Sequence, residues 1–335
     1  MSLEIAVAAA LFVGVIAYAV LGGADFGSGF FDLTAGGSRR GAEVRTLIDR
    51  SIGPVWEANH VWLIYVLVTW WTAFPASFAA AMTTVVVPLA LALLGIVLRG
   101  ASFAFRKYSE TLGQARLFGV IFACSSVLAP FCFGTVAGAL ASGRVPAGGH
   151  GGLWTSWLNP TSLFGGVIAV GTCAFLAGVF LTADAARGGQ SRLAERLRIR
   201  SLVVGAVTGA VVFAALIPLT VDSPTLSDGL TGRAAPLIVL SALGGAATLI
   251  LLLRRRYGLA RLTAVLAVSS VVSGWGLGQY PWVLADHMTI DEAAGARATL
   301  QGLLVAVGIA AVVVGPALLY LFRLTQSKEW SGAGR

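Results

Sequence analysis

The feature that most constrains this chain is a series of apolar segments, each about long enough to cross a membrane. Of its 335 residues, 57% are hydrophobic and 11% are charged, whereas a soluble domain carries about 25% charged residues. A helix of about 20 apolar residues crosses the ~30 Å hydrocarbon core of a bilayer. We therefore predict an all-α polytopic membrane protein, a single transmembrane domain over residues 1–335 with about nine transmembrane helices. The expected spans are roughly 3–31, 54–74, 76–98, 116–140, 161–184, 201–221, 235–253, 262–284 and 299–322.

The basic residues of the connections predict the orientation. Of the 23 lysine and arginine residues, 20 follow the odd-numbered spans, and the exceptions are Arg144, Arg233 and Arg297. By the positive-inside rule, the N-terminus lies outside and the C-terminus is cytoplasmic, which requires an odd number of spans. The excess of 8 positive charges is then a topology signal, with contact to anionic membrane lipid as a second consequence. It gives no reason to expect nucleic acid as a partner.

The cysteine and histidine residues predict no metal site. The three cysteines lie inside apolar segments without C-x-x-C spacing, which fits neither a zinc site nor a disulfide framework. The three histidines, His60, His150 and His287, are far apart, and no H-E-x-x-H pattern is present.

Polar and aromatic side chains gather at the start of the second span: Trp56, Glu57, Asn59, His60 and Trp62. On a helix, Glu57 and His60 are three residues apart and Trp56 and His60 are four apart, so we expect them to share one face. A carboxylate at mid-bilayer costs roughly 2.5–3.5 kcal/mol on insertion scales, so it usually faces protein or water and marks a functional site. The alternative is an interfacial anchor, with Glu57 reaching water.

Two more charged residues lie in or at the end of apolar spans. Gly23 and Gly27 have the spacing that lets a second helix approach closely, so we expect Asp25 to be buried against a neighbour. Asp25 and Glu57 lie toward the same half of the membrane and could form one end of a proton relay, although a structural hydrogen bond is the alternative for Asp25. Arg99 could pair with either carboxylate and keep it ionised, or could simply anchor the third span.

Several short runs carry a further signal. They are Gly22–Gly27, Ser51–Ile64, Thr72–Pro75, Leu98–Gly100, Phe105–Arg106, Gly276–Pro281 and Gly315–Tyr320. Together they resemble subunit II of the cytochrome bd-type quinol oxidases, and the run at 51–64 is highly specific. Between about 120 and 260 the similarity lies mainly in the spacing of the spans.

The resemblance implies a subunit of two four-helix bundles plus one peripheral helix in the bacterial plasma membrane. It implies an obligate partner, subunit I, which would hold haem b, haem d and the quinol site. Small single-helix accessory subunits are further partners that it implies. The complex would oxidise quinol and reduce O2 to water in the respiratory chain, and no cofactor is expected on this chain itself.

In the family, subunit II stabilises subunit I and contributes to a proton path from the cytoplasm. The resemblance carries this role to Glu57, the acid of the Trp-acid-x-Asn motif, to Trp62 and to Asp25. The full set of candidate proton-path residues is Glu57, Asp25, Asn59, His60, Trp56, Trp62 and Arg99. Many relatives have an acid two residues before the arginine that matches Arg106, and here that position is Ala104. The mouth of the path must then differ, using Asp25, Asp32 or water.

Two other readings stay open. One is a secondary transporter that binds a small ion or acid near the middle of the membrane, which would show broken helices in matched halves. The other is a structural scaffold in which Glu57 only locks an interface.

Overall fold

The structure, a computed structural model, describes residues 2–37, 40–52, 56–109 and 111–325. Its first part contains α1 (Leu3–Ala17), the π-helical turn η1 (Tyr18–Gly22), α2 (Gly23–Leu33), α3 (Ala42–Ile52), α4 (Trp56–Ala73), α5 (Pro75–Thr84), α6 (Val86–Lys107) and α7 (Leu112–Ala141). Its second part contains α8 (Pro160–Arg187), α9 (Ser191–Ala214), α10 (Leu216–Asp222), α11 (Pro224–Thr231), α12 (Ala235–Leu253), α13 (Tyr257–Gln279), the antiparallel strands β1 (Trp282–Leu284) and β2 (Met288–Thr289), α14 (Ile290–Ala293) and α15 (Arg297–Thr325).

Within these ranges, eight helical stretches are long and apolar enough to cross a membrane, and α4 with α5 makes a ninth if this bent pair is one span. The elements α1, η1 and α2 together form the first stretch, Leu3–Leu33. The expectation of an all-α membrane protein with about nine spans is confirmed. Residues 54 and 55 of the expected second span lie outside the described residues.

The structure divides the expected span at 76–98 into two helices. α4 and α5 meet at an angle of 118°, because Phe74 leaves helical geometry and Pro75 begins α5. A second break at Val85 separates α5 from α6. Proline is tolerated in a first helical turn, where its missing N–H has no partner to lose. Because the residues around both breaks are uncharged and mostly apolar, the length of the apolar run does not reveal the breaks.

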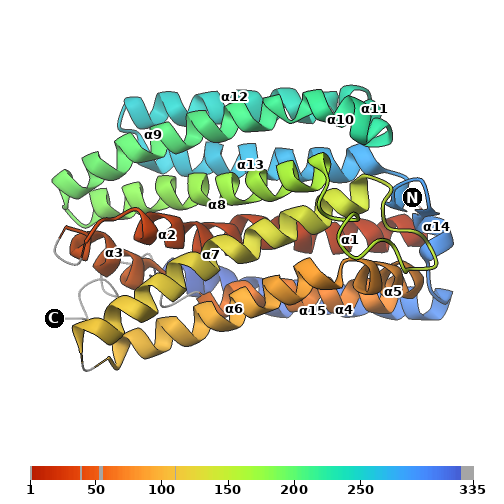
Figure 1. The fold of residues 1–335 in the computed structure, drawn as a ribbon, viewed down its shortest axis with the longest axis horizontal. Helices are drawn as coiled ribbons and strands as arrows, with labels where there is room; N and C mark the ends of the chain where they lie inside the picture. The colour runs from red at the N-terminus through yellow and green to blue at the C-terminus, as the bar shows by residue number, and fades with distance from the viewer. Residues whose placement is uncertain (1, 38–39, 53–55, 110, 326–335) are drawn as a thin grey trace.

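The long helices run side by side along the long axis of the molecule (Figure 1). One group is α8, α9, α12 and α13, and the other is α1–α2, α4, α6 and α7. The two groups meet where α2 and α7 pack on α8. α15 lies at the edge, against α1 and α4. This arrangement agrees with two four-helix bundles plus one peripheral helix.

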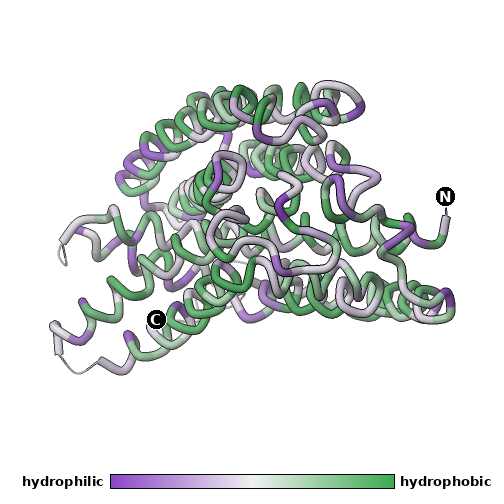
Figure 2. The backbone as a smooth tube through the Cα atoms, turned by 45° about the vertical axis from the view of Figure 1, so that its right-hand side comes forward, coloured by the Kyte–Doolittle hydropathy of each residue, from purple (hydrophilic) through white to green (hydrophobic). Residues whose placement is uncertain are grey.

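The connections that hold most of the basic residues meet at one end of the molecule, which we call the basic end. Arg196 of α9 pairs there with Glu43 of α3, which joins two of these connections, and Arg45 of α3 pairs with Asp32 at the end of α2 at 2.6 Å. α1 begins at the opposite end, where Val7 packs with Leu300 of α15. Hydrophilic segments gather toward the helix ends, and the shafts are mostly hydrophobic (Figure 2). The side of the membrane that each end faces stays a prediction from the charge pattern.

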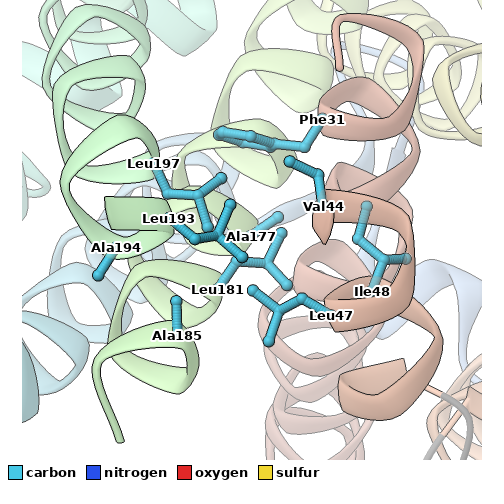
Figure 3. Packing of buried hydrophobic residues seen from close by; sticks show 10 residues of the cluster. All are labelled: Phe31, Val44, Leu47, Ile48, Ala177, Leu181, Ala185, Leu193, Ala194 and Leu197. Atoms are coloured by element: carbon cyan, nitrogen blue, oxygen red, sulfur yellow. The ribbon is translucent and has the colours of Figure 1, made fainter. Parts of the chain in front are cut away.

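One helix at the basic end was not expected. α3 lies in a connection and presents Val44, Leu47 and Ile48 at the spacing of an apolar helix face. These side chains pack into a buried cluster with Phe31 of α2 and with leucines of α8 and α9 (Figure 3). The connection between the first two spans is therefore docked on both bundles.

The glycines of α2 permit close helix contact, as the sequence predicts. A Cβ atom on Gly27 would lie 1.9 Å from the carbonyl oxygen of Cys173 in α8. A Cβ atom on Gly29 would lie 2.2 Å from Cβ of Ser126 in α7. α2 therefore packs backbone to backbone at the junction of the two bundles.

Candidate functional site

The deepest charged group is an ion pair between α2 and α6. Nη2 of Arg99 donates to Oδ1 of Asp25 at 2.7 Å, and both side chains are 2% exposed. Nε of Arg99 donates to Oγ of Ser126 at 3.1 Å, and its guanidinium lies 5.1 Å from the ring centres of both Phe26 and Phe122. Arg99 therefore pairs with Asp25 and not with Glu57.

A second ion pair joins the same two helices seven residues further along each. Nη1 of Arg106 donates to Oδ2 of Asp32 at 2.6 Å, and Arg106 also bonds Asp49 of α3. Oδ1 of Asp32 accepts from Arg45 at 2.6 Å. Seven residues of helix rise about 10 Å, so the Asp25–Arg99 pair lies about two turns inside the Asp32–Arg106 pair. Both carboxylate oxygens of Asp32 are bonded to arginine, which makes this residue an anchor for α3.

Helix α4 has two faces of different character. Asn59 is 3% exposed and faces inward, as do the partly buried Trp56 and His60. Glu57 is exposed and makes no hydrogen bond or ion pair with any residue in the described ranges. Glu57 and His60 are three residues apart on α4 and so lie on adjacent parts of its surface, with Glu57 the more exposed. Of the two pairings considered for Arg99, the structure contains the one with Asp25.

The exposed face of α4 is otherwise apolar. It continues from Glu57 through Val61, Ile64, Val68 and Trp71, each about half exposed or more. The spacing of these residues, by fours and threes, forms one stripe along the helix. We call it the Glu57 stripe. Trp62, which is only partly exposed, packs edge-on against Tyr65, with ring centres 6.2 Å apart.

The imidazole of His60 lies among aromatic rings. Its centre is 5.8 Å from Phe26, 6.2 Å from Tyr18 and 6.2 Å from Trp56. Trp56 in turn contacts Phe103 of α6. This packing holds the inner face of α4 against η1, α2 and α6, next to the Asp25–Arg99 pair.

Within the described part of the chain, four buried polar atoms at this site have no hydrogen-bond partner: Tyr18 Oη, Asp25 Oδ2, Asn59 Oδ1 and His60 Nδ1. Sequence reasoning selected three of these residues and missed Tyr18. A lone tyrosine within an apolar span has no charge and no motif to mark it. Ala104, the residue in place of the family's acid, is exposed on α6.

A cavity of about 330 Å³ lies beside this cluster, between the two bundles. Tyr18, Phe26, Phe133 and Trp275 contribute to walls that are mostly apolar. Such a lining suits a hydrocarbon chain better than a charged molecule. In the part of the chain that the structure describes, no group of three or more His, Cys, Asp or Glu side chains is placed to hold a metal ion.

Comparisons with known proteins agree with this architecture. Residues 3–325 match the family described as cytochrome bd terminal oxidase subunit II. Cytochrome bd ubiquinol oxidase subunit 2 of Bacillus subtilis (strain 168) is 30% identical over 236 residues, which are 69% of this chain and 67% of that protein. Cytochrome bd-I ubiquinol oxidase subunit 2 of Escherichia coli (strain K12) is 32% identical over 170 residues, 48% of this chain and 44% of that one.

A solved structure gives the same result for the fold. The bd oxidase from Geobacillus thermodenitrificans contains a chain that superposes with a TM-score of 0.82 at 25% identity, over 97% of this chain and 99% of that one. Nothing in these comparisons supports a transporter. The chain belongs to the cytochrome bd terminal oxidase subunit II family and is a multi-pass subunit of a bacterial membrane oxidase.

Proposed function

We propose that this chain is the haem-free subunit of a quinol:O2 oxidoreductase, that it stabilises subunit I, and that it delivers cytoplasmic protons to it. In this proposal subunit I holds haem b, haem d and the quinol site. O2 reduction consumes protons from the cytoplasm and quinol oxidation releases protons outside, so charge is separated across the membrane without a pump.

The surroundings of the histidines support placing the haems on the partner. The ring of His60 packs against three aromatic rings whose centres lie within 6.2 Å of its own, so part of the space that a macrocycle would need is already filled. Nε2 of His287 lies 2.8 Å from the carbonyl oxygen of Gly143, and His150 lies in a loop. None of these residues fits an axial haem ligand in a membrane-spanning helix.

The position of Glu57 carries the proposal. A carboxylate on the outer face of a membrane helix is costly against lipid and is expected to face protein or water. The apolar remainder of the Glu57 stripe is suited to helix packing. We therefore place subunit I on this stripe, with Glu57 directed across the contact.

The proposed path reaches Glu57 from the basic end. Asp32 is held by two arginines and Ala104 has no ionisable group, so water is the proposed carrier at the mouth. Further in, the proposed path uses the polar atoms of Asp25, which is paired with Arg99, and of Asn59 and His60. His60 is only partly buried and lies three residues from Glu57, so it links the interior to the outer face of α4. Trp56 fixes the position of His60 by packing.

Substitution of Glu57 tests this role. In the purified complex, Glu57→Gln should lower quinol oxidase turnover by about 100-fold, the lower end of what a proton-transfer group contributes, with haem content and subunit I unchanged. Asp291→Asn, at an exposed acid in α14 at the opposite end, is the control and should keep full turnover. Normal turnover in Glu57→Gln would reject the relay. Loss of haem and subunit I would instead show the scaffold role.

Two further expectations, on orientation and on accessory subunits, belong to the same proposal. The basic end faces the cytoplasm, where its arginines contact anionic lipid. Small single-helix accessory subunits would co-purify with the tagged chain, which mass spectrometry of the intact complex tests.

A further inference from the structure

Three of the four polar atoms that lack a partner among the described residues belong to side chains around a single aromatic ring, and the fourth is on Asn59, the residue before His60 in α4. Phe26 contacts Tyr18 and His60, with ring centres 6.3 Å and 5.8 Å away, and the guanidinium of Arg99 lies 5.1 Å from it. Asp25 is bonded to that guanidinium. Tyr18, Asp25 and His60 therefore belong to one small region between η1, α2, α4 and α6.

Buried polar atoms nearly always have a partner, either protein or bound water. Asp25 Oδ2 and Asn59 Oδ1 only accept hydrogen bonds, so they cannot satisfy each other. Tyr18 Oη can donate one bond and accept others, and His60 Nδ1 donates or accepts depending on its tautomer. A water molecule supplies two donors and two acceptors and needs two to four polar partners. The atoms present match these requirements.

The backbone is shaped for this arrangement. The first span is π-helical over Tyr18–Gly22, and such local widenings occur often at functional sites. A Cβ atom on Gly22 would lie 2.8 Å from the Tyr18 ring, so glycine at this position lets the ring lie against its own helix. The widened turn and the glycine together determine where the Tyr18 hydroxyl lies.

We propose that Tyr18, Asp25, Asn59 and His60 bind internal water, and that this water is the inner segment of the proton path. Tyr18 is a positioning residue, because its hydroxyl orients water between the carboxylate of Asp25 and the imidazole of His60. The second half of the proposal rests on the proton delivery proposed above. The water site itself does not.

Tyr18→Phe is the decisive variant, because it removes one hydroxyl and keeps the ring. Tyr65→Phe is the matched control, since the Tyr65 hydroxyl already donates to the carbonyl oxygen of Ala10 at 2.8 Å. Asn59→Leu removes an acceptor at nearly constant size and serves if Tyr18→Phe fails to assemble. All variants are prepared as the complete oxidase complex.

The first readout is a cryo-EM map of the complex at a resolution that shows water. We expect ordered water within hydrogen-bonding distance of at least two of the four atoms, and its loss in Tyr18→Phe but not in Tyr65→Phe. A map in which the four atoms pair directly, or in which a hydrocarbon chain fills the space, would overturn the water site.

The second readout is turnover in H2O and D2O. Tyr18→Phe should slow quinol oxidation about fivefold, the factor that one neutral hydrogen bond typically contributes, and raise the solvent isotope effect with haem content unchanged. Unaltered turnover and isotope effect would overturn the role in the path. If Glu57→Gln kept normal turnover, the proposed function would fail, and the map would still decide whether the water site exists.

Discussion

The Asp25–Arg99 pair should be strongly coupled in stability. Both side chains are 2% exposed, so removing one partner leaves an uncompensated charge where little water reaches it. Breaking a buried ion pair in this way costs about 3–5 kcal/mol. We therefore expect Asp25→Asn and Arg99→Met each to destabilise the chain by about this amount. Removing both charges together should cost only about 1–3 kcal/mol, the penalty for unpaired neutral polar groups.

The assay is the apparent melting temperature of the purified complex, followed by tryptophan fluorescence. At roughly 2 °C per kcal/mol for a large chain, each single variant should melt about 6–10 °C below the wild type. The double variant should melt above both. A double variant that melts at or below the less stable single variant would show that the two charges act independently, and the reasoning from burial would fail.

Two further results follow from local geometry. Gly27→Ala puts a methyl group 1.9 Å from the Cys173 carbonyl oxygen, so forcing α2 from α8 should cost about 1–3 kcal/mol in the same melting assay. Gly245→Ala, whose Cβ meets no atom within 4 Å, should be neutral or stabilising, and equal losses would contradict the packing argument. Hydrogen bonds from the backbone and side chain of Thr289 lower the pKa of Glu292 below 4.5. This capping contribution is complete above pH 4.5 and is lost as pH falls through the lowered pKa. Above that range, the Thr289 amide should exchange hydrogen more slowly in the wild type than in Glu292→Gln. This difference should disappear as the pH falls through the lowered pKa, and a difference that does not depend on pH would refute the capping argument.

Much of the fold follows from the sequence, because a long apolar run in a membrane protein can only be a helix or part of a closed barrel. The number of spans and the docking of α2 through Gly27 were predictable on this basis. The break at Val85 and the docking of α3 were not. The uncharged residues on both sides of Val85 continue a run of high hydropathy, so the break has no charge or glycine to mark it, and α3 has too many charges to resemble a span.

The site was partly predictable. Asp25, Asn59 and His60 stood out because polar groups are costly among apolar residues, and the structure buries Asn59 and brings Asp25 and His60 to the same aromatic ring through Arg99 and Phe26. The position of Glu57 was not predictable, since α4 is apolar on most sides and spacing alone does not say which face is covered. The partner of Arg99 depends on how α6 is aligned along its axis with α2 and α4. No short sequence pattern predicts that alignment.

The Asp25–Arg99 pair also has a consequence for how the chain is made. The two residues are 74 positions apart, so at ~5–20 residues per second the ribosome adds the arginine about 4–15 s after the aspartate. During that interval the first span carries a carboxylate that costs roughly 2.5–3.5 kcal/mol at mid-bilayer. Pairing with Arg99 removes that cost, so we expect the first span to become more stable at its final depth when α6 arrives. Membrane insertion of the first and third spans is coupled, and a chain truncated before α6 should leave its first span poorly inserted.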